Sequence, residues 1–182
     1  THYLRYKNDS IMISSKTLNI DNPKLNCRLK GFENFSPRRI ILDKNLEIKI
    51  NSYIFKSAKK DNTIIFHNSS NNRKIKILKR KGITLVKFKV DNKKLFNLKA
   101  ILKKLFILGV RNLLVEGGDK ITKNLIQNRL IDKFYLFKSP KNLLISKEHI
   151  KFTSFNMLNS KYKIKTRISP KLAKDNITIY KR

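Results

Sequence analysis

Short apolar runs recur along the first half of the chain, separated by polar segments rich in asparagine and lysine. Short apolar runs between turn-forming residues are typical of strands buried inside a sheet. The segments predicted as strands on this basis are Asp9–Ser14, Arg38–Asp43, Thr63–His67, Ile75–Leu78 and Thr84–Val90. The last of them alternates between apolar and polar residues, so one of its faces is expected to be polar.

Two polar stretches between these runs are predicted as loops. Residues 16–28 contain Asp21-Asn22-Pro23, and proline restricts both itself and the residue before it, which favours a fixed turn. Asn68–Arg73 is a second polar stretch without apolar periodicity.

The apolar spacing changes to that of a helix in Asn97–Leu108, where the apolar residues recur every three or four positions. This helix leads into Gly109–Leu130, around which the chain is organised. Leu113–Val115 predicts a fully buried strand that ends at Glu116 and is followed by Gly117-Gly118. The helical pattern then resumes, with its apolar face formed by Ile121, Leu125, Ile126 and Leu130.

A strand that passes through two glycines into a helix is one way to build a phosphate site. Glycine lets the backbone approach an anion closely, and the first N–H groups of a helix point toward it. A tight turn alone also favours glycine, so Gly117 and Gly118 are weak evidence by themselves. Glu116 strengthens the interpretation, because ligands of open α/β sheets bind at the carboxyl ends of strands.

The C-terminal third contains further strand patterns. Lys133–Lys138 is predicted as a strand that ends at Ser139-Pro140, and the alternating segments Tyr162–Ile168 and Asn176–Lys181 are predicted to pair antiparallel and close the sheet. Helices and strands alternate in the middle of the chain while strands dominate its ends. The sequence therefore predicts one α/β domain over residues 1–182, with a mixed sheet and helices on its faces.

Composition limits the setting and the cofactors. The chain has 182 residues, of which 40% are hydrophobic, enough for one sizeable core. Lysine interrupts every apolar stretch before it reaches the length of a membrane span. A single cysteine, Cys27, and three scattered histidines give no disulfide and no metal-ligand spacing, so no metal site and a reducing, cytoplasmic setting are expected.

Charge is the strongest compositional feature: 43 Lys+Arg against 12 Asp+Glu give a formal net charge of +31. Nucleic acid, an anionic membrane surface or phosphorylated small molecules all fit such a charge. Lysine is spread over nearly every segment and accompanies an excess of asparagine and isoleucine, which is typical of AT-rich coding drift at surface positions. A local patch, rather than net charge, marks a nucleic-acid footprint, so nucleic acid is the less favoured partner.

Several motifs, in order and spacing, resemble those of one family. The motifs are Arg5, Asp9, the block Thr17-x₃-Asp21-Asn22-Pro23-x-Leu25-x₂-Arg28, Arg39–Asp43, Leu113–Gly118 and Leu130-Ile131-Asp132. Together they resemble the reductase domain of the bifunctional riboflavin-biosynthesis deaminase–reductase, over residues 2–141. The resemblance implies a dihydrofolate-reductase-like α/β fold: a mixed, mostly parallel sheet with helices on both faces and an antiparallel C-terminal pair.

The same resemblance implies an activity, namely NADPH-dependent reduction of 5-amino-6-(5-phosphoribosylamino)uracil to the ribitylamino compound. The hydride would go to C1′ of the ring-opened ribosyl group. Further implications are a homodimer or homotetramer and a fused deaminase domain. The family's opening strand is not found in this sequence, so the chain is expected to be part of a longer protein, without one sheet strand and part of its site.

Site residues are carried over by position. On the substrate side, Arg5 and Arg28 resemble the family's substrate arginines, Glu116 its substrate glutamate, and Leu25 a lining residue. An arginine fork suits a 5′-phosphate, and a carboxylate can accept from pyrimidine N–H groups or a ribose hydroxyl. The resemblance assigns Thr17 and Asp21 to the cofactor side, and it places Asp21 near the reacting carbon as well. The dinucleotide phosphate loop would be formed by Gly118, Asp119, Lys120, Ile121 and Thr122.

The sequence departs from the family pattern in two places. The family usually has glycines between the strand that begins at Asp9 and Thr17, where this sequence has Ser14 and Lys16. Asp119 places a negative charge beside the proposed phosphate turn, which is favourable only if Asp119 caps the helix and faces away. Two other interpretations therefore stay open: a basic nucleic-acid-binding module and an inactive structural relative of the reductase.

Overall fold

The computed structural model describes residues 1–139, 152–168 and 176–182. The chain divides into two compact units, Thr1–Gly118 and Asp119–Arg182. Each unit is considered by itself below.

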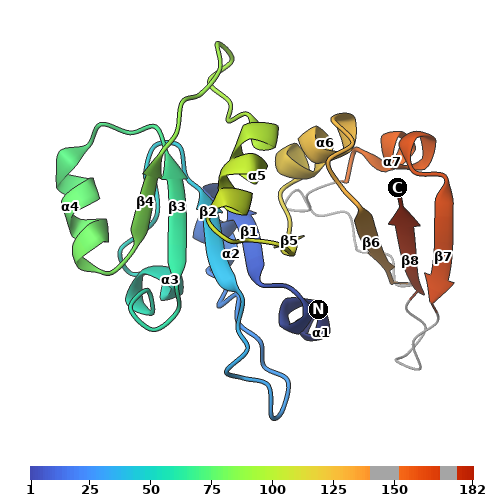
Figure 1. Cartoon of the computed structure of the whole chain (residues 1–182), viewed down its shortest axis with the longest axis horizontal. Coiled ribbons are helices and arrows are strands. Elements are labelled where there is room, and N and C mark those ends of the chain that lie inside the picture. Colours follow the sequence, from blue (N-terminus) through green and yellow to red (C-terminus); the bar gives the residue numbers. More distant parts are fainter. Residues whose placement is uncertain (140–151, 169–175) are drawn as a thin grey trace. The chain divides into compact units, whose positions relative to one another are not determined.

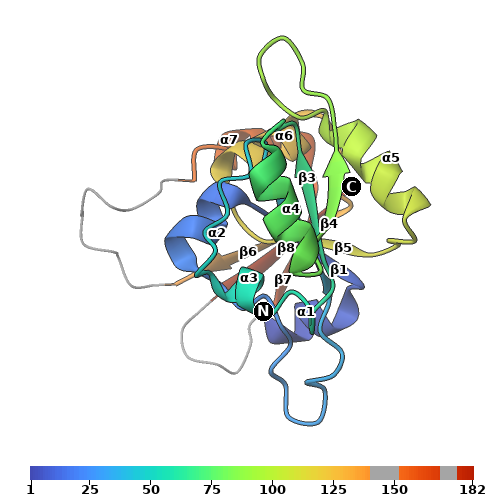
Figure 2. The same cartoon turned by 90° about the vertical axis from the view of Figure 1, so that its left-hand side faces the viewer.

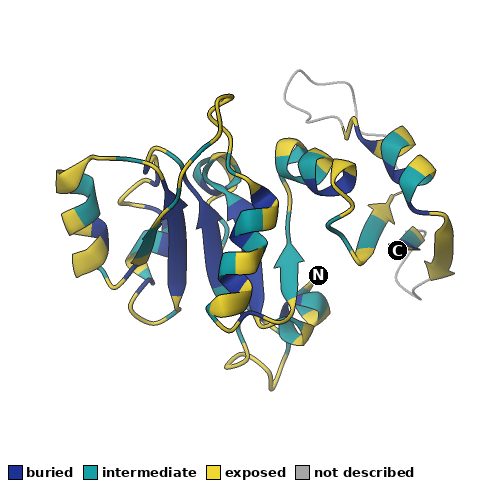
Figure 3. Ribbon diagram, turned by 45° about the horizontal axis from the view of Figure 1, so that its top comes forward, coloured by how far each residue is buried: buried dark blue, intermediate teal, exposed yellow. Residues whose placement is uncertain are grey.

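The first unit is built on a five-stranded sheet in the order β4-β3-β2-β1-β5, in which all pairs of neighbouring strands are parallel. The strands are β1 (Ser10–Ser14), β2 (Arg38–Leu42), β3 (Thr63–His67), β4 (Thr84–Lys87) and β5 (Leu113–Val115). All the buried residues of the five strands lie in the three inner ones (Figure 3), as their isoleucine-rich runs predict.

Helices connect these strands. Helix α1 (His2–Lys7) precedes β1, and α2 (Ser15–Asp21), α3 (Tyr53–Lys56) and α4 (Asn72–Arg80) follow β1, β2 and β3 in turn. Helix α5 (Leu98–Ile107) lies between β4 and β5. Figure 2 shows α5 on one side of the sheet and α2 and α4 on the other. The connections from β1 through β4 run along the sheet in one direction, and the connection from β4 to β5 runs back in the other. Because connections between parallel strands are right-handed, α5 must lie on the opposite face from α2 and α4.

The first unit's main core lies between the sheet and the helices α2 to α4. It contains Ile11 and Ile13 of β1, Ile41 of β2, Ile65 of β3 and Leu78 of α4, all no more than 1% exposed. At the start of β1, the Asp9 carboxylate accepts from the backbone N–H groups of Arg111 and Asn112, at 2.9 and 3.0 Å, and so fixes the entry to β5.

The second unit combines a three-stranded antiparallel sheet with two helices. The strand order is β6-β8-β7, with β6 (Lys133–Lys138), β8 (Asn176–Lys181) and β7 (Ile164–Ile168). Helices α6 (Asp119–Gln127) and α7 (Phe155–Lys161) pack with this sheet around Ile126, Leu158, Tyr162 and Tyr180.

Most predicted elements are confirmed, including the β7–β8 antiparallel pair and the α/β class with a mostly parallel sheet. Four predictions are wrong in part. Ile75–Leu78 belongs to helix α4, Ser15–Asp21 is helix α2 rather than loop, and Leu113–Val115 is half-buried because β5 is an edge strand of its sheet. The C-terminal pair joins β6 in a separate sheet instead of closing the parallel one. Pro140, predicted to end β6, lies outside the described residues.

Candidate functional site

The candidate site of the first unit lies where the strand order reverses. Strands β1 and β5 are parallel neighbours, and the backbone N–H of Glu116 continues their ladder by donating to the Met12 carbonyl at 3.1 Å. The carboxyl ends of both strands, Ser14 and Glu116, therefore lie at the same edge of the sheet. The carboxyl edge at such a reversal is where open α/β sheets bind ligands.

Glu116 is held by a two-pronged ion pair with Arg5. The Nε and Nη2 atoms of Arg5 donate to the two carboxylate oxygens of Glu116 at 2.8 and 2.6 Å, and Nη1 donates to the Asn26 carbonyl at 3.1 Å. The side chains of Arg5 and Glu116 are 11% and 24% exposed. Arg5 thus uses every guanidinium nitrogen within the unit, whereas each Glu116 oxygen keeps a lone pair for a further donor.

Thr17 lies beside the glycine turn that follows Glu116. Ser14 caps helix α2 by accepting from the Thr17 backbone N–H at 3.2 Å, and the two hydroxyl groups are 3.0 Å apart. Gly117 has a φ of 81°, which favours glycine, and a Cβ atom built there would meet Thr17 Cγ2 at 3.9 Å. The positive φ, and not a lack of space, is therefore what favours glycine at this position beside the Thr17 side chain.

The Asp-Asn-Pro block ends helix α2. Asp21 is the last helical residue and is exposed, and Asn22 has the left-handed conformation at φ 41° that commonly terminates a helix. The Asn22 side chain accepts from the Tyr53 backbone N–H at 2.8 Å, which joins the block to α3. Leu25, expected to line the substrate side, is 1% exposed and belongs to the core, with a φ of 57°.

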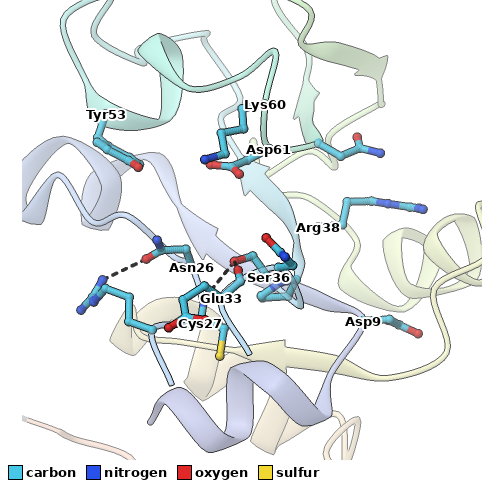
Figure 4. Close-up of a pocket in the computed structure, with 13 residues that line it drawn as sticks. Asp9, Asn26, Cys27, Glu33, Ser36, Arg38, Tyr53, Lys60 and Asp61 are labelled. Carbon is cyan, nitrogen blue, oxygen red and sulfur yellow. Dashed lines mark hydrogen bonds between the residues drawn. The ribbon is translucent and has the colours of Figure 1, made fainter. Parts of the chain in front are cut away.

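Arg28 lines a pocket of about 600 Å³ at the other edge of the sheet, near the amino ends of β1 and β2 (Figure 4). Tyr53 and Lys60 lie on one side of this pocket and Asn26 on the other. Arg28 Nη1 donates to the Asn26 side-chain oxygen at 2.9 Å. Asn26 therefore bonds both predicted substrate arginines, through its side chain to Arg28 and through its carbonyl to Arg5.

The proposed phosphate loop spans the boundary between the two units. Gly118, with a φ of 92°, is the last residue of the first unit, and Asp119, Lys120, Ile121 and Thr122 form the first turn of α6 in the second. The Asp119 carboxylate accepts from the Thr153 hydroxyl at 3.0 Å and from the Thr153 backbone N–H at 3.3 Å. Asp119 does not meet the condition of an N-cap that faces away, because it is already helical and its carboxylate is bound by Thr153.

Sequence patterns missed the roles of Asn26 and Ser14. Asn26 bonds Arg5 through its backbone carbonyl and Arg28 through its side chain, and Ser14 accepts from the Thr17 backbone N–H; neither role follows from the spacing of the motifs. Lys16, which departs from the family pattern, is an exposed residue of α2. Among the described residues, no cluster of three potential metal ligands occurs, and no helix is long and apolar enough to cross a membrane.

The fold and the site define an α/β protein with a doubly wound parallel sheet and an arginine-held carboxylate at its switch point. The family profile of the RibD C-terminal domain matches residues 1–150. The chain therefore belongs to the RibD C-terminal domain family.

Relatives with assigned names agree with this family. The riboflavin biosynthesis protein RibD of Aquifex aeolicus is 31% identical over 140 residues, covering 77% of this chain and 37% of the relative. The 2,5-diamino-6-ribosylamino-4(3H)-pyrimidinone 5′-phosphate reductase of Debaryomyces hansenii is 32% identical over 152 residues, covering 77% of this chain and 62% of the relative. The chain thus spans from about a third to under two thirds of these proteins.

Solved structures share the fold. A pyrimidine reductase-like protein from Corynebacterium diphtheriae has a TM-score of 0.73 at 16% identity, covering 99% of this chain and 78% of the other. A deaminase/5-amino-6-(5-phosphoribosylamino)uracil reductase from Thermotoga maritima has a TM-score of 0.71 at 19% identity, covering 99% and 47%. The second protein carries both named activities, and this chain matches less than half of it.

Proposed function

We propose that this chain is the reductase part of a riboflavin-biosynthesis enzyme. It would reduce 5-amino-6-(5-phosphoribosylamino)uracil to 5-amino-6-(5-phosphoribitylamino)uracil, with NADPH as the reductant. Family membership supports the class of reaction. The observation that carries the proposal is Glu116, fixed by Arg5 at the switch point with acceptor capacity left over.

Glu116 is the proposed substrate anchor. A carboxylate clamped by an arginine cannot rotate freely, so its remaining lone pairs point in fixed directions. Pyrimidine N–H groups and sugar hydroxyl groups are donors that suit it. Arg28 is the proposed phosphate ligand. Its pocket lies near the amino ends of β1 and β2, but Asn26 links Arg28 to Arg5, which holds Glu116. Arg28 is exposed, and its guanidinium keeps donors beyond the one bonded to Asn26. Arg5 is a positioning residue, since all its nitrogens are engaged.

The cofactor side of the first unit is assigned to Thr17, Asp21 and Gly118, and Asp119 to Thr122 are assigned to the cofactor from the family resemblance alone. The glycine turn beside the Thr17 side chain supports the close approach of a dinucleotide. When bound, NADPH supplies the hydride. The chain's own residues would hold C1′ of the ring-opened sugar against it and exclude competing orientations. Asp21 is the proposed charged group near the reacting carbon.

The name of one relative points to a second candidate substrate of the same class. The Debaryomyces hansenii protein is named for the 2,5-diaminopyrimidinone, which has an amino group where the uracil has an oxygen. An anchor that accepts hydrogen bonds, such as Glu116, is compatible with both rings. We assign the phosphoribosylaminouracil as the substrate, and the diaminopyrimidinone is the compound against which its turnover is compared.

The test measures NADPH oxidation by the whole chain with each of the two ribosylaminopyrimidine 5′-phosphates, under matched conditions, and identifies the product by mass. The expected result is consumption of one NADPH per ribityl product formed, with higher kcat/KM for the uracil. Preference for the diaminopyrimidinone would overturn the substrate assignment and leave the reductase assignment intact. NADPH binding without turnover of either compound would favour the inactive relative.

Three further expectations stay predictions: a homodimer or homotetramer and a fused deaminase domain, both from the family resemblance, and a cytoplasmic location, from the single cysteine. Analytical ultracentrifugation of the chain tests the first directly. A sedimentation mass equal to that of one chain would contradict it.

A further inference from the structure

A second pocket, in the second unit, is lined almost entirely by cations. It encloses about 260 Å³ between the ends of helices α6 and α7 and one end of the antiparallel sheet, and its lining residues are Arg129, Lys161, Tyr162, Lys163, Ile164, Lys181 and Arg182. Figure 1 shows the end of β8 and the start of β7 at the same end of this sheet, near α7.

This concentration of charge exceeds what the basic composition explains. Five of the seven lining residues are cationic, whereas lysine and arginine make up 43 of the 182 residues of the chain. Neither of the two ion pairs found among the described residues involves any of the five. The charges therefore lie together without a carboxylate partner in that part of the chain.

Capping of the helix ends explains only part of the cluster. Lys161, in the last turn of α7, donates to the Gln127 carbonyl at the end of α6, at 2.5 Å, and cations are favourable at helix C-termini. Lys163 and Lys181 have no such role, because they flank or belong to strands. Lys181 lies directly opposite Lys133 across the β6–β8 pair, and like charges in that position repel.

Tyr162, which lines the pocket, has a buried hydroxyl whose proton has no acceptor among the described residues. Tyr162 is 1% exposed. Burial raises the pKa of the Tyr162 phenol, whereas the Ile131 backbone beside the hydroxyl acts in the opposite direction, and the neutral hydroxyl can donate. A buried donor without an acceptor is costly, and an anion would satisfy it.

We propose that this pocket binds a small oligophosphate anion. The lining lysine and arginine side chains would supply the charge and Tyr162 a neutral donor, a combination that suits adjacent phosphate groups. The pocket is concave and small, which favours a compact anion over the extended phosphate backbone of a nucleic acid. None of the residues that line this pocket is among those assigned to the proposed reductase site.

The test uses the whole chain, with inorganic pyrophosphate as the probe and sulfate at equal ionic strength as the reference, by isothermal titration calorimetry. The test variant is Lys163→Gln with Lys181→Gln. The matched control is Lys123→Gln with Lys138→Gln, which removes the same charge from exposed positions of α6 and β6 that do not line the pocket. Tyr162→Phe removes only the hydroxyl.

Saturable pyrophosphate binding is expected, weakened at least tenfold in the test variant, at least threefold in Tyr162→Phe and less than twofold in the control. The test variant without ligand should unfold at the same or a higher temperature, because repulsion between Lys133 and Lys181 is relieved. Equal losses in test and control variants, or equal binding of sulfate, would overturn the proposal. A single-stranded RNA that displaces pyrophosphate and binds more tightly would overturn the assignment to a small anion.

Discussion

At the scale of single residues, Asp21 is placed where helix stability does not explain it. It is the last residue of α2, and a carboxylate at the C-terminal end of a helix faces the negative end of the helix dipole. It is exposed and forms no ion pair found in the described part of the chain. An unfavourable position of this kind is consistent with a role in the proposed reaction.

The substitution Asp21→Asn separates the effect of Asp21 on helix stability from its role in the proposed reaction. We expect the free energy of unfolding to stay constant or to rise by about 0.3–1 kcal/mol, because the repulsion by the helix dipole is removed. We expect kcat/KM for NADPH oxidation to fall at least tenfold. Urea unfolding and steady-state kinetics measure the two quantities. The control is Glu47→Gln, which removes an exposed carboxylate that bonds only Asn45 through its side chain in the described structure. Unchanged kinetics would remove Asp21 from the proposed site.

Glu116→Gln tests the substrate anchor. The amide keeps the shape of the side chain and loses its charge, so kcat/KM for the pyrimidine should fall by the equivalent of about 1.5–3 kcal/mol. The Kd for NADPH should stay within about twofold, because Glu116 is assigned to the substrate side only. Fluorescence titration with NADPH and steady-state kinetics give the comparison. Equal losses for both ligands would mean that Glu116 lies on the cofactor side, or that the pair with Arg5 organises the whole site.

At the scale of elements, the carboxyl end of β3 carries a buried titratable group. His67 is 3% exposed, and its Nδ1 atom has no hydrogen-bond partner among the described residues. Burial lowers the pKa of His67, and Lys87 and Lys79 act in the same direction, whereas the Ser69 backbone and Asp43 oppose it. The folded chain therefore favours the neutral imidazole.

The consequence is a stability that depends on pH. Because the pKa of His67 is lower in the folded chain, the unfolded chain binds more protons as the pH falls below about 6.5, and stability is lost through that range. His67→Phe should reduce the loss between pH 7.5 and 5, as measured by urea unfolding. The pKa of His2 is also lowered, so the wild type and His67→Phe both keep a smaller loss of stability toward low pH from that residue. An identical pH dependence in the variant would contradict this origin.

Asp43, directly after β2, is a buried carboxyl whose effect on the pH dependence of stability is opposite to that of His67. Burial raises the pKa of the Asp43 carboxyl, although its oxygens accept from the backbone N–H groups of Glu47 and Ile48 at 2.7 and 2.8 Å. A raised carboxyl pKa lowers stability as the pH rises from about 4, which is opposite in sign to the effect of His67. The comparison of wild type with His67→Phe cancels most of this contribution, because Asp43 is present in both.

At the scale of the whole molecule, repulsion among like charges outweighs attraction between opposite ones. The formal charge is +31, and the described residues contain two ion pairs, Arg5–Glu116 and Arg39–Asp61. Most cations therefore repel one another in the compact state, a cost that the expanded chain relieves.

Salt should therefore stabilise the protein. Raising NaCl from about 0.01 M to 0.1 M shortens the screening length from about 30 Å to about 10 Å, so we expect the midpoint of thermal unfolding to rise by several degrees. Calorimetry at a series of NaCl concentrations checks this, and chloride avoids the multivalent anions that the second pocket is proposed to bind. A midpoint that falls with NaCl would show that ion pairs outweigh repulsion.

The sequence by itself determined the strands of the parallel sheet and the family. The buried runs of β1, β2 and β3 are apolar enough to be recognised locally, and the block from Thr17 to Arg28 is specific in spacing. The strand prediction for Ile75–Leu78 was wrong, because a run of four residues with three aliphatic side chains and one lysine fits a strand and a helix alike. Only the packing of Leu78 into the core and the Asn71 cap select the helix.

Tertiary structure alone decided the partners within the site. Arg5 and Glu116 are 111 positions apart, and no local pattern indicates that the arginine clamps the glutamate instead of reaching for a phosphate. The half-burial of β5 and the separation of β6, β7 and β8 into their own sheet likewise depend on which strands become neighbours. Local propensity acts within a few residues, whereas ion pairs and sheet order depend on contacts between segments that only the folded chain brings together.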